Sequence, residues 1–138
     1  MNSKEYLSQA YRIDQRINSK LEQVRSLNEL ATKATNTISD MPGSATRNVH
    51  QMEDVVVKIV DLQNEINADI DTLVNLKRTF VAVIKAVENP EQQTLLELRY
   101  LCFKTWEEIA VEMGYSSRGI FSLHSAALKE LEKNKSVQ

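Results

Sequence analysis

The sequence predicts an all-α protein, and two observations support this prediction. The chain has 138 residues but only three glycines and two prolines, whereas a β sandwich or barrel needs a turn signal about every 8–12 residues. Aromatic residues make up only 6% of the chain, while leucine, alanine, glutamate, lysine and glutamine are plentiful. These side chains lose little rotamer freedom in a helix. The length fits one domain, or one small domain with a helical extension, and the few breakers should mark its boundaries.

The first predicted helix runs from the amino terminus to about residue 38. Its apolar residues recur at steps of three or four and form one stripe. Asn2 or Ser3 can cap the start through a short polar side chain. Pro42 and Gly43 end the helix, because proline lacks the amide proton and glycine adopts positive φ at little cost. The stripe consists of Ala10, Ile13, Ile17, Leu21, Val24, Leu27, Ala31, Ala34 and Ile38.

A second, stronger stripe predicts a helix over about residues 49–88, with Asn48 as its cap. Joined by the short Pro42-Gly43 loop, the two helices should form a long antiparallel, coiled-coil-like hairpin. The second stripe consists of Met52, Val56, Ile59, Leu62, Ile66, Ile70, Leu73, Leu76, Phe80, Val83 and Val87.

Further valines widen the apolar face of the second helix, namely Val55, Val57, Val60, Val74 and Val81. Two helices can bury only one stripe against each other. We therefore predict a homodimer that forms through a helical bundle. The alternative is that the carboxy-terminal part of the same chain packs back along the hairpin.

Three short helices are predicted after the hairpin, over about residues 91–101, 106–113 and 117–133. Asn89 followed by Pro90 is a helix-start signal, Thr105 with Glu108 fits a capping box, and Ser116 can cap the last helix. We expect residues 133–138 to be frayed. The sequence thus divides into a hairpin over 1–89, for dimerisation or partner binding, and a three-helix domain over 90–138.

The segment from Glu107 to Leu123 has the spacing of a helix-turn-helix. Ala110 is small enough for two helices to approach closely, and Gly114 suits the left-handed turn position. Ile109, Met113, Ile120 and Leu123 would fill the angle between the helices. In such a motif the second helix enters the major groove of DNA.

Together with Leu95 to Tyr100 before it and Ala127 to Leu131 after it, this segment resembles the region-four domain of bacterial sigma factors, which reads the −35 promoter element. The resemblance covers about residues 91–133. The whole layout is similar to small phage and prophage proteins, including late-gene transcription regulators and uncharacterised phage proteins. It implies a DNA-binding transcription regulator in the cytoplasm of a bacterial host, with double-stranded DNA and RNA polymerase as candidate partners.

The resemblance places the DNA-reading face at the start of the last helix. Arg118 is the one basic residue there, and residues 91–138 hold six Lys and Arg against seven acids, a net charge of −1. Phosphate neutralisation supplies most non-specific DNA affinity, so a dimer or a polymerase partner would have to add to it. The candidate base-reading residues are Ser117, Arg118, Phe121, Ser122 and Ser125, and the candidate phosphate contacts are Arg99, Lys104, Lys129 and Lys133.

The poor basic content leaves a second hypothesis open. In it the three-helix unit is structural, and the chain is an adaptor or inhibitor that binds RNA polymerase or another host protein through the hairpin. An enzyme is not expected, because the chain lacks a Gly-rich phosphate loop, a nucleophile elbow and a His-Glu-x-x-His pattern. No cofactor or metal is predicted, since His50 and His124 have no ligand partners at a motif spacing.

The remaining polar and aromatic residues have structural interpretations. Tyr100, Phe103 and Trp106 are expected in the core, and Cys102 is expected to be a buried or half-buried small hydrophobe. The acids of the second helix should form a solvated face; they are Asp54, Asp61, Glu65, Asp69 and Asp71. The longest apolar run, residues 80–84, is too short to span a bilayer, so no membrane association is expected.

Overall fold

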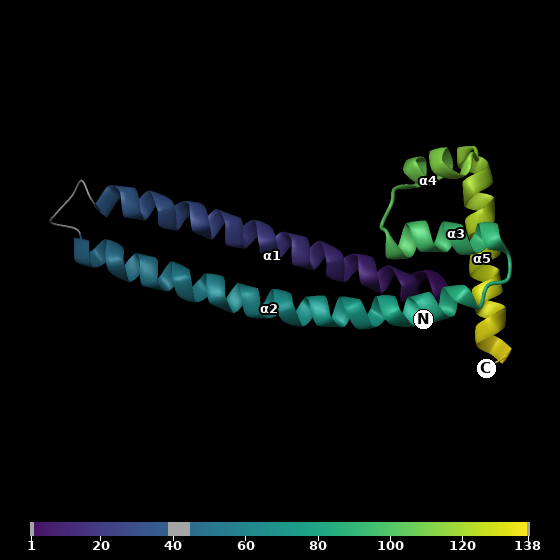
Figure 1. Cartoon of the computed structure of the whole chain (residues 1–138), viewed down its shortest axis with the longest axis horizontal. Helices are drawn as coiled ribbons and strands as arrows, with labels where there is room; N and C mark the ends of the chain where they lie inside the picture. Colours follow the sequence, from purple (N-terminus) through teal and green to yellow (C-terminus); the bar gives the residue numbers. More distant parts are fainter. Residues whose placement is uncertain (1, 39–44, 138) are drawn as a thin grey trace. The chain divides into compact units, whose positions relative to one another are not determined.

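The computed structural model confirms the all-α fold (Figure 1). It describes the backbone of residues 2–38 and 45–137, without a strand in those ranges, and the side chains of residues 2–33 and 50–134. The predicted turn at Pro42 and Gly43 lies outside the described residues. The elements are α1 (Ser3–Ile38), α2 (Ala45–Lys85), α3 (Pro90–Leu96), the π-helical turn η2 (Glu97–Leu101), α4 (Trp106–Met113) and α5 (Ser117–Val137).

The chain divides into two compact units. The hairpin unit spans Asp14–Thr72, and the terminal unit combines Met1–Ile13 with Leu73–Gln138. Helices α1 and α2 each contribute to both units. This division does not coincide with the boundary that the sequence suggested at residue 89, because the end of α2 belongs with the carboxy-terminal helices. The functional division at that residue stays a prediction.

In the hairpin unit, the seam of α2 that faces α1 has a strict heptad spacing. Met52, Val55, Ile59 and Leu62 are partly buried and Ile66 is buried. Steps of three and four keep these residues on one side of a helix. The seam therefore includes Val55, which we had placed outside the stripe, and leaves out Val56 and Ile70, which are 51% and 41% exposed.

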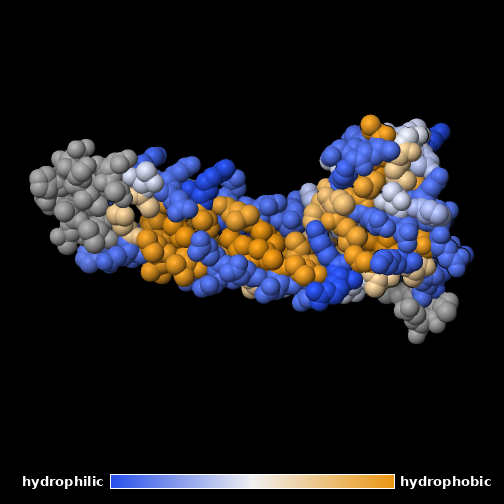
Figure 2. All heavy atoms as spheres, viewed as in Figure 1, coloured by the Kyte–Doolittle hydropathy of each residue, from blue (hydrophilic) through white to orange (hydrophobic). Residues whose placement is uncertain are grey.

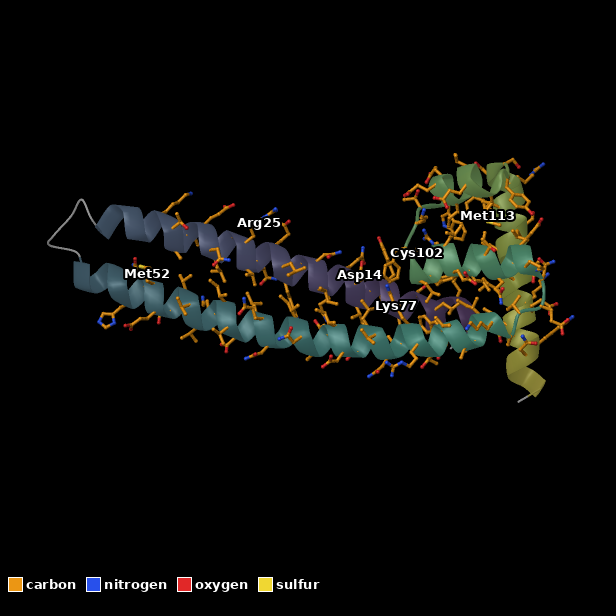
Figure 3. The ribbon with its side chains drawn as sticks, in the orientation of Figure 1. Asp14, Arg25, Met52, Lys77, Cys102 and Met113 are labelled. Carbon is orange, nitrogen blue, oxygen red and sulfur yellow. The ribbon has the colours of Figure 1, made fainter. Side chains whose placement is uncertain are left out.

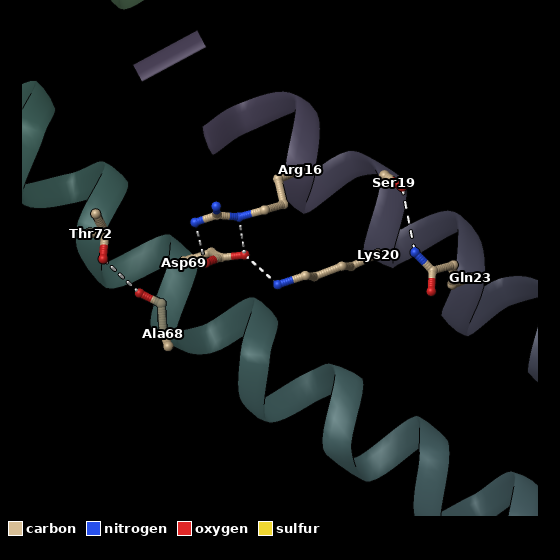
Figure 4. A network of polar contacts seen from close by, with 7 residues as sticks. All are labelled: Arg16, Ser19, Lys20, Gln23, Ala68, Asp69 and Thr72. Carbon is tan, nitrogen blue, oxygen red and sulfur yellow. Dashed lines mark hydrogen bonds and ion pairs between the residues drawn. The ribbon is translucent and has the colours of Figure 1, made fainter. Parts of the chain in front are cut away.

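Asp69 occupies the next position of this seam and is buried, which corrects its assignment to a solvated acidic face. Arg16 donates to its carboxylate from Nε at 3.2 Å and from Nη2 at 2.9 Å, and Lys20 Nζ donates at 2.8 Å (Figure 4). These hydrogen bonds hold the pKa of Asp69 below its ordinary value. Lys20 thus occupies the seam position that the apolar spacing predicted for Leu21, which is 50% exposed. The stem of Lys20 packs while its ammonium neutralises the carboxylate.

The terminal unit has a hydrophobic core that joins the start of α1 and the end of α2 to the carboxy-terminal helices. Leu7 and Ala10 of α1 pack with Phe80 and Ile84 of α2. The Tyr6 and Phe80 rings meet edge to face, with centroids 5.1 Å apart. From the later helices the core receives Leu95, Leu96, Tyr100, Ile109, Ala110, Ile120, Ala127 and Leu131. Within this unit the carboxy-terminal helices share a core with the first turns of α1 and the last turns of α2. Val57, Val60 and Val74 of the valine-rich face are exposed, so its cover by a second copy or by the carboxy-terminal part of the same chain stays a prediction.

The helix boundaries confirm several predicted caps and correct others. Asn2 Oδ1 accepts from the Glu5 amide at 2.9 Å, and Asn89 Oδ1 accepts from the Glu91 amide at 2.9 Å. The proposed cap Asn48 is wrong, because α2 begins at Ala45 and Asn48 lies inside it. Helix α5 continues to Val137, so its backbone is helical where fraying was expected.

Candidate nucleic-acid interface

Helices α4 and α5 are joined by a tight turn built from three local signals. Thr105 caps α4 in a full capping box with Glu108. Gly114 ends α4 in the left-handed conformation, with φ of 74°. A Cβ there would meet no atom within 4 Å, so the conformation and not the space favours glycine. Ser116 Oγ accepts from the Gly119 amide at 3.1 Å and caps α5 as predicted.

The angle between α4 and α5 is filled by the predicted apolar residues. Ile109 and Ile120 are fully buried, and Ala110 is 8% exposed. Leu123 and Met113, the latter labelled in Figure 3, are half-buried against the same core. The Tyr115 amide donates to the Ala110 carbonyl at 2.9 Å and closes the turn. This packing fixes which face of α5 points outward.

The five candidate base-reading residues are all exposed on α5, and three of them share its outward face. Its inward face is the buried row Ile120, His124, Ala127 and Leu131. The opposite side carries Arg118, Ser122 and Ser125, whereas Phe121 lies on the flank toward Trp106 and Ser117 lies in the first turn, nearer to the buried row; all five are exposed. Lys129 follows on the same side one turn later. The structure therefore brings Arg118, Ser122 and Ser125 together on one face, with Phe121 at its edge and Ser117 apart from it, and contact of these residues with DNA stays a prediction.

The candidate phosphate contacts differ in whether their charged groups already interact with other residues of the chain. The Arg99 guanidinium lies over the Trp106 ring at 4.4 Å and donates to the Lys104 carbonyl at 2.9 Å. Lys104 Nζ forms an ion pair with Glu112 that raises the pKa of the lysine. Lys133 lies 3.8 Å from Glu130 and is 76% exposed. Arg118 and Lys129, by contrast, are exposed and make no ion pair with another described residue.

An aromatic cluster lies directly beside this face. The Trp106 ring is 4.6 Å from the His124 ring and 5.4 Å from the Phe121 ring. Tyr100 Oη and His124 Nε2 share a buried hydrogen bond of 2.7 Å. The structural interpretation of Tyr100 and Trp106 is thus confirmed, since both pack against the core.

Burial controls the titration of the two polar members of this cluster. It raises the pKa of Tyr100 to about 12. Burial, assisted by the positive charges of Lys4 and Arg99, lowers the pKa of His124 to about 4. His124 is therefore a neutral ring at physiological pH, which supports packing rather than ligand binding.

A cavity of about 190 Å³ opens between this cluster and the first turns of α1. Lys4, Ser8 and Tyr11 line it on one side, and Arg99 and Phe103 line it on the other. Sequence reasoning missed the α1 residues as neighbours of the cluster, and no local signal could have found them, because the contact joins segments about ninety residues apart. The two cations give the cavity a positive rim.

Two further expectations concern Cys102 and metal binding. Cys102 is exposed after η2, so the prediction of a buried or half-buried thiol is wrong (Figure 3). Within the described ranges, no three residues of the His, Cys, Asp and Glu types gather in a way that could hold a metal ion. None of the described helices is both long and apolar enough to cross a membrane.

Comparison with known proteins places the chain in a family. A family model described as "protein of unknown function (DUF1492)" matches residues 35–132. The chain belongs to the DUF1492 family. The match includes the last residues of α1, the whole of α2, the α3 to α4 region and most of α5, so it spans the second helix of the hairpin and the candidate interface. Searches of curated proteins and of solved structures found no match.

Proposed function

We propose that this chain is a dimeric, DNA-binding transcription regulator of phage or prophage origin. It reads promoter DNA in the cytoplasm of a bacterial host through α5, the helix predicted over 117–133. The observation that carries the proposal is the outward face of α5. There Arg118, Ser122 and Ser125 are exposed, and Ser117 is exposed in the first turn of the same helix. Arginine and serine at the start of such a helix are donors suited to base edges and phosphates.

Phe121 supports the same assignment. It is 50% exposed although it packs against Trp106. A half-exposed ring at this position can make an apolar contact with a thymine methyl group. Lys129 and Lys133, further along α5, would then contact phosphates.

A second candidate function is supported by the intramolecular contacts that several of the basic residues make. Arg99 and Lys104 are engaged inside the chain, and residues 91–138 carry a net charge of −1. A unit with so few unengaged cations also suits an adaptor or inhibitor that binds RNA polymerase or another host protein. In that case the α4–α5 unit is structural and the hairpin carries the contact.

A gel-shift experiment separates the two functions. The full chain is titrated against the DNA upstream of its own gene, at about 50 and about 200 mM salt. We expect sequence-selective binding at low salt that weakens steeply at high salt. We expect Arg118→Ala to weaken binding by about fivefold or more, because one lost specific contact costs about 1–3 kcal/mol. Arg78→Ala, an exposed arginine on α2, is the matched control and should bind as wild type.

Absence of binding at the lower salt concentration would remove the DNA-binding proposal. Co-purification of RNA polymerase with the chain, abolished by charged substitutions on the valine-rich face of α2, would then support the adaptor function.

A further inference from the structure

Helix α2 carries a second stripe outside the seam that faces α1. It consists of Val56, Val60, Gln63, Asn67, Ile70 and Val74. Its four apolar members are between 41% and 51% exposed. Figure 2 shows apolar surface gathered along the helices of the hairpin on the face in view. Exposed valine and isoleucine at this density on one helix face indicate a surface that another element covers.

The spacing of this stripe is that of a coiled-coil seam. Its steps are four, three, four, three and four residues, the same alternation that α2 uses against α1. No charged residue occurs at these six positions. A helix with two heptad seams on adjacent flanks is the pattern of a helix inside a bundle rather than of a helix in a two-stranded hairpin.

The residue types along the stripe, apolar or carboxamide, follow the same order in both directions about position 65. Val56 mirrors Val74, Val60 mirrors Ile70, and Gln63 mirrors Asn67. In an antiparallel pair of identical helices related by a twofold axis at position 65, each residue meets its mirror partner. Apolar side chains then meet apolar ones, and the two carboxamides meet at the centre. Such a central polar pair fixes the register of a coiled coil.

The mirror relation continues beyond the stripe with opposite charges. Glu53 mirrors Lys77 about the same position. Glu53 is 67% exposed, and the Lys77 ammonium lies 4.7 Å from the Phe103 ring centroid. An antiparallel pair would bring the two charges together twice, once at each end, where ion pairs set orientation and register. A parallel pair would place like charges opposite each other.

We propose that the second stripe of α2 binds the same stripe of a second copy of this chain, antiparallel and with the twofold axis at position 65. The inference rests on the dimer in the proposed function and specifies its partner, surface and register. A second copy is favoured over another protein because only self-association requires a residue order that is symmetric about one point. Because the stripe carries no charge, two identical stripes can pack together without electrostatic repulsion. A surface for a charged partner would instead be expected to carry charges of the opposite sign.

Engineered disulfides test the register in the full chain. In a Cys102→Ser background, which removes the exposed native thiol, three variants are oxidised mildly: Val60→Cys, Ile70→Cys and the double variant. In the proposed dimer, residue 60 faces residue 70 of the other copy. Two copies of residue 60 are about 15 Å apart, at about 1.5 Å per residue, beyond the reach of a disulfide. The same distance prevents a bond between residues 60 and 70 of one chain.

We expect covalent dimer in the double variant and its loss in both single variants. Equal cross-linking of the single variants would indicate a parallel pair and overturn the proposal. Absence of cross-linking in the double variant would overturn it as well.

Sedimentation equilibrium provides a readout that does not depend on cysteine chemistry. The wild-type chain should sediment as a dimer at micromolar concentration, Val60→Glu should shift it to monomer, and Val111→Glu, at an 82% exposed site on α4, should remain dimeric. A monomeric wild type would contradict the proposal. Neither experiment contains DNA, so failure of the dimer and failure of DNA binding are observed separately.

Discussion

Phe80→Ala is expected to lower the free energy of unfolding of the terminal unit by about 3–5 kcal/mol, because a fully buried phenylalanine is replaced by a cavity. Phe80 has no exposed surface, and its ring meets Tyr6 from α1 while it shares a core with Leu95 and Ile109. Urea unfolding followed by the fluorescence of Trp106, the one tryptophan of the chain, measures the change. The reporter lies in α4, so the experiment asks whether the end of α2 supports the later helices.

Val111→Ala is the matched control, because Val111 is 82% exposed on α4. Its effect should stay within about 0.5 kcal/mol. An unchanged Trp106 transition in Phe80→Ala would mean that the hairpin and the carboxy-terminal helices unfold independently. That result would support residue 89 as a boundary between folding units.

His124 is expected to make the stability of the terminal unit depend on pH between about 6.5 and about 4. Its pKa is about 4 in the folded chain, against an ordinary value of 6.5. Between these two pH values the unfolded chain binds a proton at His124 and the folded chain does not. The contribution of His124 to the free energy of unfolding is therefore fully present above about pH 6.5 and is lost as the pH falls toward about 4. The loss reaches up to about 3 kcal/mol at the lower end of this pH range.

The measurement compares urea midpoints at pH 7 and near pH 4.5 for wild type and His124→Gln. The variant should lose much less stability on acidification, because glutamine has no proton to gain. His50→Gln removes a histidine that is 72% exposed and should keep the wild-type pH dependence. Parallel losses in wild type and His124→Gln would show that other groups control the acid response.

The broad fold could be predicted because local signals agree with one another along the chain. The 3-4 apolar spacing gave both long helices, and the caps at Asn89, Thr105 and Ser116 gave the starts of three short ones. The seam of α2 was assigned less well. An apolar stripe with valines on two adjacent flanks does not reveal which flank faces α1.

The details that could not be predicted depend on contacts between distant segments. Asp69 is an acid within an acidic helix, and only the approach of Arg16 and Lys20 from α1 explains its burial. The π-helical turn at 97–101 and the positive φ of Phe103, 58°, likewise have no recognisable local signal. Both sit where the chain passes from α3 toward the capping residue of α4.

The candidate interface was predictable in part. The candidate residues on α5 were taken from the resemblance to sigma region four, and the buried side was predicted separately from the helix-turn-helix spacing, which placed Ile120 and Leu123 between the helices. The intramolecular roles of Arg99 and Lys104 did not follow, since a basic residue near a helix end suggests a phosphate contact equally well. The packing of Trp106 against Arg99 and His124 could not be predicted either, because it depends on how η2, α4 and α5 are arranged in space.

Site-specific photo-cross-linking tests the central claim, that the outward face of α5 touches DNA, most directly. A benzophenone side chain replaces Ser122, and the full chain is irradiated with the DNA upstream of its own gene at about 50 mM salt. We predict a covalent protein–DNA adduct that decreases at about 200 mM salt, and no adduct from the same side chain at Val57, an exposed position of the hairpin unit. No adduct at position 122, or equal adducts at both positions, would contradict the claim.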